Sequence, residues 1–266
     1  SFHWDEPYDY VERVHSAGAL LMYTVGDAEA ARRAVAAGVD IIVAQGWEAG
    51  GHVRGDVATM ALLPVVVDAV APVPVISAGS IADGRGMAAA LMLGADGVWI
   101  GTRFVTSDEA DVDPSYKERI INASETGTLL SSKVFNGGWA AGGRALRNNT
   151  IENWEAAGSP EVGERPGEGE VIAKAADGGP VERYSSIASY SGVAGDLEGL
   201  SNWAGQGVGL IKRVQPAADI VREITEEAIQ VLRKASTLWR VADAPDSLTT
   251  WCDRMTPETS HLIGAL

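Results

Sequence analysis

The sequence has little of what disulfide-bonded, membrane-spanning or nucleic-acid-binding proteins require. Its 266 residues include one cysteine, Cys252, so no internal disulfide can form and a reducing setting is expected. Basic residues number 21 against 36 acidic ones, and the net charge of −15 argues against broad contact with a phosphate backbone. No apolar run reaches the roughly 18 residues that span a bilayer, because Asp68, Pro72 and Pro74 interrupt the most hydrophobic stretch. We therefore expect a cytoplasmic protein with no nucleic-acid or membrane partner.

Short β-branched runs alternate with alanine-rich stretches between residues 19 and 104. Strands are predicted at 19–25, 39–44, 73–78 and 97–104, and helices between them at 27–37, 60–70 and 86–93. Asp27 offers a carboxylate that caps the first of these helices, while Gly38 and Gly94 follow helices at points that favour a left-handed residue. Because the strand at 39–44 is apolar at nearly every position, we expect a parallel sheet covered by helices on both faces. The pattern fits an open doubly wound sheet and a closed eight-fold barrel equally well.

The repetition ends after Phe104. Residues 107–209 are rich in Gly, Ser, Glu and Pro and contain one clear predicted helix, at 114–124. We expect the tryptophans of this segment, Trp139 and Trp154, to serve packing. Pro216 then begins a periodic helix that runs to about residue 234. Its apolar face is predicted to consist of Ile220, Val221, Ile224, Ile229 and Leu232.

The segment from residue 44 to residue 52 reads Ala-Gln-Gly-Trp-Glu-Ala-Gly-Gly-His and directly follows a buried strand. Its glycines let the backbone approach a ligand closely, and Gln45 offers both hydrogen-bond donors and acceptors. His52 can exchange a proton near neutral pH. The alternative interpretation is a glycine-rich loop whose histidine is merely solvated. The end of a strand is where α/β proteins place their sites, which favours the functional interpretation.

Two further strand ends carry small residues, at Gly79–Ser80 and at Gly101–Thr102. Backbone N–H groups at successive strand ends can form a phosphate cradle, as barrels do after their last two strands. Each pair alone is weak evidence, since Gly79 and Gly101 would also suit simple tight turns. Together and in this order, the two pairs favour a phosphate-bearing cofactor.

Residues 44–52, 74–86 and 101–104, together with the run Trp203-Ala204-Gly205-Gln206, resemble the signature segments of the nitronate monooxygenase family, formerly called 2-nitropropane dioxygenases. The resemblance extends from residue 1 to about residue 234. It implies an FMN-dependent (β/α)₈ barrel that oxidises nitronates, and in some cases nitroalkanes, to carbonyl compounds and nitrite with molecular oxygen.

The resemblance also implies roles for single residues. His52 would be the active-site base or the electrostatic partner of the substrate nitro group. The predicted flavin contacts are Gln45, Gly50, Gly51, Gly79, Ser80, Gly101 and Thr102, of which the last four would hold the FMN phosphate. Ser80 departs from the family, which usually has a second glycine there: its hydroxyl would be able to donate to the phosphate, whereas its Cβ would crowd the approach. His3 is a weaker candidate for the substrate pocket.

The predicted fold is α/β, of the (β/α)₈ TIM-barrel type, incomplete at the N-terminus, with about the last five strands present and an excursion inserted after the last strand. Residues 1–4 would be the remnant of a preceding strand. We expect a partial FMN-binding barrel at 1–106, a cap-like excursion at 107–209, a helix returning to the barrel at 210–235 and a tail at 236–266.

Two other functions remain open at this point. The first is an FMN-dependent enoyl reductase or an NADH:quinone reductase of the same superfamily, which would require a nicotinamide donor. The second is a non-catalytic, truncated remnant. The physiological substrate and the oligomeric state cannot be read from the sequence.

Overall fold

The computed structural model of the chain describes residues 8–135 and 141–238. They divide into two compact units. The first unit is formed by the residues up to Gly46, by 57–100 and by those from Ala217 on, and the second by 47–56 and 101–216. Trp139, Trp251 and Cys252 lie outside the described residues, as do residues 1–4 and the predicted tail beyond Leu238. No helix within 8–135 and 141–238 combines the length and apolar character needed to cross a bilayer.

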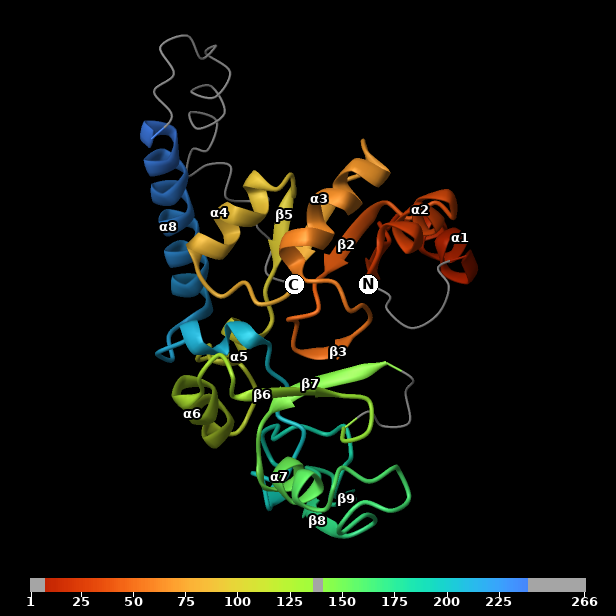
Figure 1. The fold of residues 1–266 in the computed structure, drawn as a ribbon, viewed down its shortest axis with the longest axis vertical. Helices are drawn as coiled ribbons and strands as arrows, with labels where there is room; N and C mark the ends of the chain where they lie inside the picture. Colours follow the sequence, from red (N-terminus) through yellow and green to blue (C-terminus); the bar gives the residue numbers. More distant parts are fainter. Residues whose placement is uncertain (1–7, 136–140, 239–266) are drawn as a thin grey trace. The chain divides into compact units, whose positions relative to one another are not determined.

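A four-stranded parallel sheet forms the centre of the first unit (Figure 1). Its strands lie in the order β1 (Met22–Val25), β2 (Ile41–Gln45), β4 (Val75–Ala78) and β5 (Gly97–Trp99). The helices of this unit are α1 (Tyr8–Ser16), α2 (Ala28–Ala36), α3 (Thr59–Val70), α4 (Gly84–Met92) and α8 (Ala217–Leu238). The predicted α/β class and parallel strand direction are confirmed.

The helix boundaries follow from the capping residues that the sequence supplies. The Asp27 carboxylate accepts a hydrogen bond from the Ala30 N–H at 2.7 Å and caps α2, and the Asp83 side chain caps α4 in the same way. Gly38 and Gly94, which follow α2 and α4, have φ values of +97° and +99°. Only glycine adopts this conformation without steric cost, so both predicted helix ends are confirmed.

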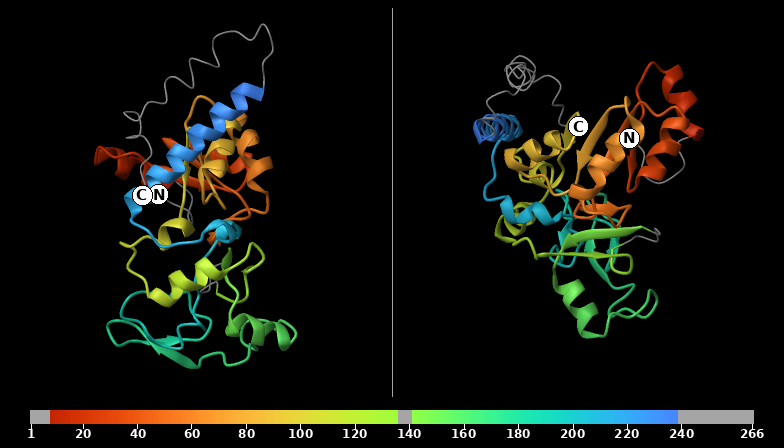
Figure 2. Two further views of the ribbon diagram at one scale, coloured as in Figure 1. Left: turned by 90° about the vertical axis from the view of Figure 1, so that its left-hand side faces the viewer. Right: turned by 45° about the horizontal axis from the view of Figure 1, so that its top comes forward.

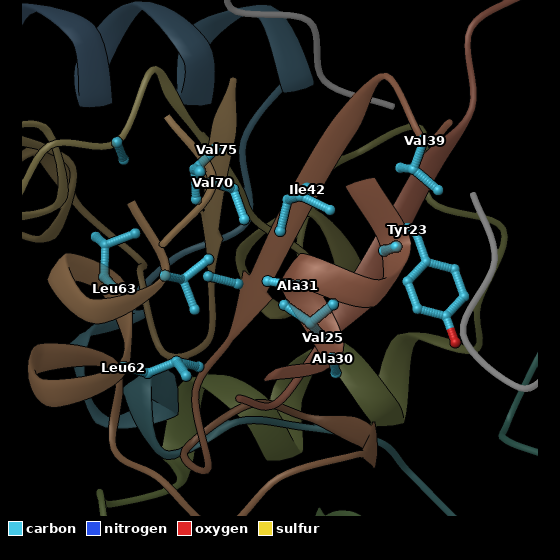
Figure 3. Close-up of a cluster of buried hydrophobic side chains, with 14 of the residues drawn as sticks. Tyr23, Val25, Ala30, Ala31, Val39, Ile42, Leu62, Leu63, Val70 and Val75 are labelled. Carbon is cyan, nitrogen blue, oxygen red and sulfur yellow. The ribbon is translucent and has the colours of Figure 1, made fainter. Parts of the chain in front are cut away.

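Apolar side chains from the sheet and from helices α2, α3 and α4 form a closely packed core in the first unit (Figure 3). Val25 of β1, Ile42 of β2 and Leu63 of α3 are fully buried, and Ala31 of α2 packs among them. Burying each such aliphatic side chain stabilises the fold by about 1.5–3 kcal/mol. This packing fixes the strands, and with them the loops that leave their carboxyl ends.

The predicted strand at 97–104 is wrong in its second half. The strand ends at Trp99, and residues 102–105 form one helical turn, α5 (Thr102–Val105), in which the Phe104 N–H donates to the Gly101 carbonyl at 2.8 Å. Trp99 pairs with Ala78, the last residue of β4, so beyond it no neighbouring strand offers a ladder of hydrogen bonds. The chain satisfies its backbone groups internally instead.

The second unit contains more regular structure than the one predicted helix, α6 (Pro114–Asn122). One antiparallel sheet has the order β3 (Gly51–Val53), β7 (Gly142–Leu146) and β6 (Thr128–Ser131), and another has the order β10 (Ala194–Gly195), β8 (Val171–Lys174) and β9 (Pro180–Glu182). Helix α7 (Asn149–Ala156) and a 3₁₀ helix (Gln206–Leu210) complete the unit. Trp154 is 7% exposed within an apolar cluster, which confirms its predicted packing role.

Helix α8 packs along α4, as Figure 1 and both views of Figure 2 show. Its buried residues are Ile220, Ile224, Ala228 and Leu232, so the predicted face is correct except that Val221 and Ile229 are only half-buried. The helix continues to Leu238, beyond its predicted end. The Glu227 carboxylate accepts a hydrogen bond from the Gly84 N–H at 2.7 Å, which ties the start of α4 to α8.

We predict that Gly84→Ala weakens this contact while Gly86→Ala, two residues further along α4, does not. A methyl group at Gly84 would lie 2.4 Å from the Ala228 nitrogen and 2.5 Å from the Ile224 carbonyl oxygen, whereas at Gly86 the nearest atom is the Ile81 Cγ2 at 3.3 Å. Overpacking should cost about 1–3 kcal/mol at Gly84, against a helix-propensity gain of up to about 1 kcal/mol at either position. Urea unfolding measures both, and equal stabilities of the two variants would contradict the prediction.

Candidate functional site

Gln45, Gly79 and Ser80 lie at the carboxyl ends of two adjacent strands in the first unit. Gln45 ends β2 and is in register with Ala78, the last residue of β4, and the Gly46 N–H donates to the Ala78 carbonyl at 2.9 Å. Gly79 has a φ of +116°, and a methyl group there would lie 3.1 Å from the Gly46 carbonyl oxygen. The two loops therefore leave the sheet side by side, as expected for parallel strands.

Ser80 has a φ of +56°, in the left-handed region that glycine adopts freely. For a residue with a Cβ, this conformation costs about 1–2 kcal/mol. The departure from the family's usual glycine is thus accommodated in the backbone at a conformational cost.

His52 lies in β3 of the second unit, where it pairs with Gly143 of β7. Its imidazole contacts the indole of Trp203, with the ring centroids 5.2 Å apart and the planes inclined by 37°. Phe135 meets the same indole edge-on at 6.3 Å. A methyl group at Gly143 would lie 2.6 Å from the Trp203 ring, so the missing side chain at 143 makes room for the indole on which His52 rests.

The loop that carries His52 is packed backbone to backbone against residues 203–206. A methyl group at Gly50 would lie 2.4 Å from the Gly205 nitrogen, so glycine is required at 50 by the chain's own packing. The Gln206 N–H donates to the Glu48 carbonyl at 3.0 Å, and the Gly205 N–H donates to the Thr102 hydroxyl oxygen at 3.0 Å. Three segments distant in sequence thus meet at the loop that carries His52.

Two other glycines that are predicted to contact the flavin, Gly51 and Gly101, differ from Gly50 because the space next to their Cα atoms is open. Among residues 8–135 and 141–238, no atom beyond the glycine's own chain neighbours lies within 4 Å of the position that a Cβ would occupy at Gly51 or at Gly101. Gly51 also has a φ of +68°, whereas the backbone of Gly101 is in a region that any residue adopts. The Thr102 hydroxyl, which accepts a bond from Gly205, still has its own hydrogen to donate. These features fit the close approach of a phosphate-bearing cofactor to residues 101 and 102.

Burial lowers the pKa of His52 below its ordinary value of 6.5, because the half-buried imidazole loses the water that would stabilise its charged form. The imidazole is therefore mainly neutral at pH 7. In the unfolded chain it binds a proton more readily, so its contribution to stability is complete above pH 6.5 and is lost as the pH falls through the lowered value.

The sequence matches the family model described as nitronate monooxygenase over residues 1–227. The chain belongs to the nitronate monooxygenase family. The predicted family resemblance, which was based on the segments around Gln45, Gly79 and Gly101, is thereby confirmed.

Curated relatives include members that carry the family name. The nitronate monooxygenase of Neurospora crassa is 34% identical over 240 residues, covering 84% of this chain and 58% of the relative. The Mycobacterium tuberculosis protein Rv1533 is 40% identical over 226 residues, covering 85% of this chain and 57% of the relative. The chain thus spans less than two thirds of the length of these relatives.

Solved structures resemble the chain over most of its length. FabK from Thermotoga maritima aligns with a TM-score of 0.71 and 32% identity, covering 89% of this chain and 70% of that one. A nitroalkane oxidase from Streptomyces ansochromogenes aligns with a TM-score of 0.62 and 26% identity, covering 86% and 62%.

The predicted site residues of this family member fall in both units. Gln45, Gly79 and Ser80 belong to the first, and Gly50, Gly51, His52, Gly101 and Thr102 to the second, while His3 lies outside the described residues. Their ligand contacts stay predictions.

Sequence reasoning gave no role to Arg144 or to the Trp203 ring. Trp203 begins a segment that resembles the family, which was the one available signal for it. Arg144 lies in a glycine-containing run that carries no motif, so nothing marked it before the pairing of β3 with β7 was known.

We predict that Trp203→Leu raises the pKa of His52 toward 6.5, because a smaller, branched side chain leaves the imidazole more hydrated. Trp203→Phe keeps an aromatic face and should give a smaller rise. NMR titration of the imidazole signals measures both pKa values, with His52→Asn identifying the His52 signal. A His52 pKa that is the same in wild type and Trp203→Leu would contradict the prediction.

Proposed function

We propose that the chain is the cofactor-binding and catalytic part of an FMN-dependent oxidoreductase that converts nitronates or nitroalkanes to carbonyl compounds and nitrite with molecular oxygen. Membership of the nitronate monooxygenase family supports this reaction class. The likeness to a nitroalkane oxidase structure is consistent with a nitro-compound substrate. The (β/α)₈ barrel, of which the parallel strands of the first unit would be the last part, stays part of the proposal.

The observation that carries the proposal is the half-buried His52, which rests on Trp203 next to the open backbone of Gly51, and burial lowers the pKa of its imidazole. A neutral imidazole can accept a proton, so the base role is favoured over that of a permanently charged partner. Removal of the α-proton of a nitroalkane leaves a nitronate anion and an imidazolium. The positive ring would then stabilise the anion that it has just formed.

Flavin mononucleotide, when bound, would supply the redox step between the nitronate and oxygen. The residues proposed to hold it are Gln45, Gly50, Gly51, Gly79, Ser80, Gly101 and Thr102. At 101 and 102 the support is specific, since the backbone is uncovered and the Thr102 hydroxyl has a hydrogen to donate. At Gly50 the support is weaker, because the glycine there is already required by the packing against Gly205.

A reductase that takes electrons from a nicotinamide is the second candidate. It is favoured by the likeness to FabK, an enoyl reductase, whose TM-score of 0.71 exceeds the 0.62 obtained with the nitroalkane oxidase. Adding NADH to the flavin-loaded chain without oxygen separates the two candidates. Rapid bleaching of the flavin absorbance would support the reductase, and an unchanged spectrum would support the monooxygenase.

We predict that His52→Asn lowers kcat/KM for nitroethane by about 10²–10⁴-fold, because no base then accepts the α-proton. Activity on preformed propionate 3-nitronate, which needs no deprotonation, should fall far less. In the wild type, kcat/KM for nitroethane should fall as the pH drops through the His52 pKa, below 6.5. Oxygen uptake measures both activities, and an equal loss on both substrates would remove His52 as the base.

We predict that Gly101→Ala separates cofactor binding from folding. In the described part of the chain the added methyl meets no atom within 4 Å apart from its sequence neighbours, and the backbone conformation suits alanine, so the stability of the flavin-free chain should change by less than about 0.5 kcal/mol. Its dissociation constant for FMN should rise at least about tenfold if the cofactor approaches this backbone. Flavin fluorescence quenching gives the dissociation constant, and an unchanged value would place the phosphate elsewhere.

A further inference from the structure

Arg144 is a fully buried, charged side chain next to the loop that carries His52. It lies in β7 directly opposite Gly51 of β3, and only 2% of its surface is exposed (Figure 1 shows the two strands). Burying a guanidinium removes it from water and is costly unless its N–H groups find partners. Arg144 has such partners, and they belong mainly to one turn.

The guanidinium donates to two carbonyl groups of that turn. Its Nε donates to the Ala49 oxygen at 3.1 Å and its Nη2 to the Trp47 oxygen at 3.0 Å. The planar group also lies over the Trp47 ring, 4.5 Å from the centroid, and Nη1 donates to the Thr128 hydroxyl at 3.4 Å. The Arg144 side chain therefore contacts the turn at two carbonyl groups and at the Trp47 ring.

The carbonyl between these two is bound from another segment. The Glu48 oxygen accepts from the Gln206 N–H at 3.0 Å, so three successive carbonyls, at 47, 48 and 49, are all fixed. A turn that lacks regular secondary structure has no ladder of its own to hold it. Here the hydrogen bonds from Arg144 and Gln206 take the place of such a ladder. They fix the residues that directly precede Gly50, Gly51 and His52.

A planar fork is needed for this geometry. Arginine presents several N–H groups in fixed directions and stacks on aromatic rings, whereas lysine offers one compact ammonium on a flexible stem. Burial lowers the pKa of Arg144 and the charge of Glu48 raises it, so the carboxylate of the turn partly compensates the buried cation. Lysine would keep the positive charge but would lose the simultaneous hydrogen bonds to the Trp47 and Ala49 carbonyls.

We propose that Arg144 is a positioning residue: by binding the Trp47 and Ala49 carbonyls from β7, it sets where the His52 imidazole and the open backbone of Gly51 lie. Its effect on catalysis rests on the proposed function, in which His52 is the base. The fixation of the turn does not, because it concerns contacts within the chain itself.

The test compares Arg144→Lys with Arg147→Lys. Arg147 belongs to the same part of the chain but forms a partly exposed ion pair with Glu155 at 2.8 Å, which is of little consequence for the turn. Two readouts are needed: the pKa of His52 by NMR titration of the flavin-free chain, and kcat/KM for nitroethane of the flavin-loaded chain.

In Arg144→Lys we expect the His52 pKa to rise toward 6.5, because the loosened turn lets water reach the ring. We expect kcat/KM to fall about 100-fold, the size of effect that a displacement of about 1 Å can cause. Arg147→Lys should leave both unchanged. A folded Arg144→Lys variant with a wild-type His52 pKa would overturn the inference.

If Arg144→Lys does not fold, hydrogen exchange of the Arg144 side chain in the wild type tests the inference. The Nε–H of Arg144 should then exchange with solvent far more slowly than that of a free arginine, and rapid exchange would overturn the inference. A wild type without activity on either nitro compound, combined with a shifted His52 pKa in Arg144→Lys, would reject the proposed function and support the positioning role.

Discussion

The close approach of two backbone segments, at Gly50 and Gly205, is the constraint on which the candidate site depends. A single methyl group at 50 would lie 2.4 Å from the Gly205 nitrogen, so this contact requires glycine at 50, and a methyl group at 205 would lie 3.0 Å from the Glu48 oxygen and the Gly50 nitrogen. The Gln206 and Gly205 amides then bind the Glu48 carbonyl and the Thr102 hydroxyl. This contact joins three distant parts of the sequence, at 48–52, 102 and 203–206, and Trp203 lies against the His52 ring.

Charge and burial work together at this point of the second unit. A half-buried imidazole stays neutral because it has lost water, and that is the state a base requires. The buried guanidinium of Arg144 would be unfavourable alone, yet it satisfies two carbonyls that would otherwise need partners. The Trp47 and Ala49 carbonyls and the Arg144 guanidinium therefore stabilise each other, and these hydrogen bonds fix the conformation of the turn.

The features that the sequence predicts correctly, such as the ends of helices, depend on residues that are adjacent in the sequence. Asp27 and Gly38 mark both ends of α2 because capping and left-handed backbone depend on the residue itself. The strand at 97–104 was predicted too long because its true end is set by Ala78, where the neighbouring strand stops. Arg144 was missed altogether, since its bond to the Ala49 carbonyl joins residues 95 positions apart. The glycine-rich loop at 44–52 and its histidine were predicted, but the reason for glycine at 50 lies in Gly205 and could not be read from the loop.

Hydrogen–deuterium exchange of the Gly205 and Gln206 amides tests the central claim most directly. Gly205 lies in a loop, and Gln206 is the first residue of a short 3₁₀ helix. At such places an amide without a hydrogen-bond partner exchanges almost as fast as in an unstructured peptide. If they donate to Thr102 and Glu48 as described, their exchange should be slowed at least about 100-fold relative to an unstructured peptide. Exchange at the unprotected rate would mean that the two segments do not meet, and that nothing holds the His52 loop in the position on which its proposed role depends.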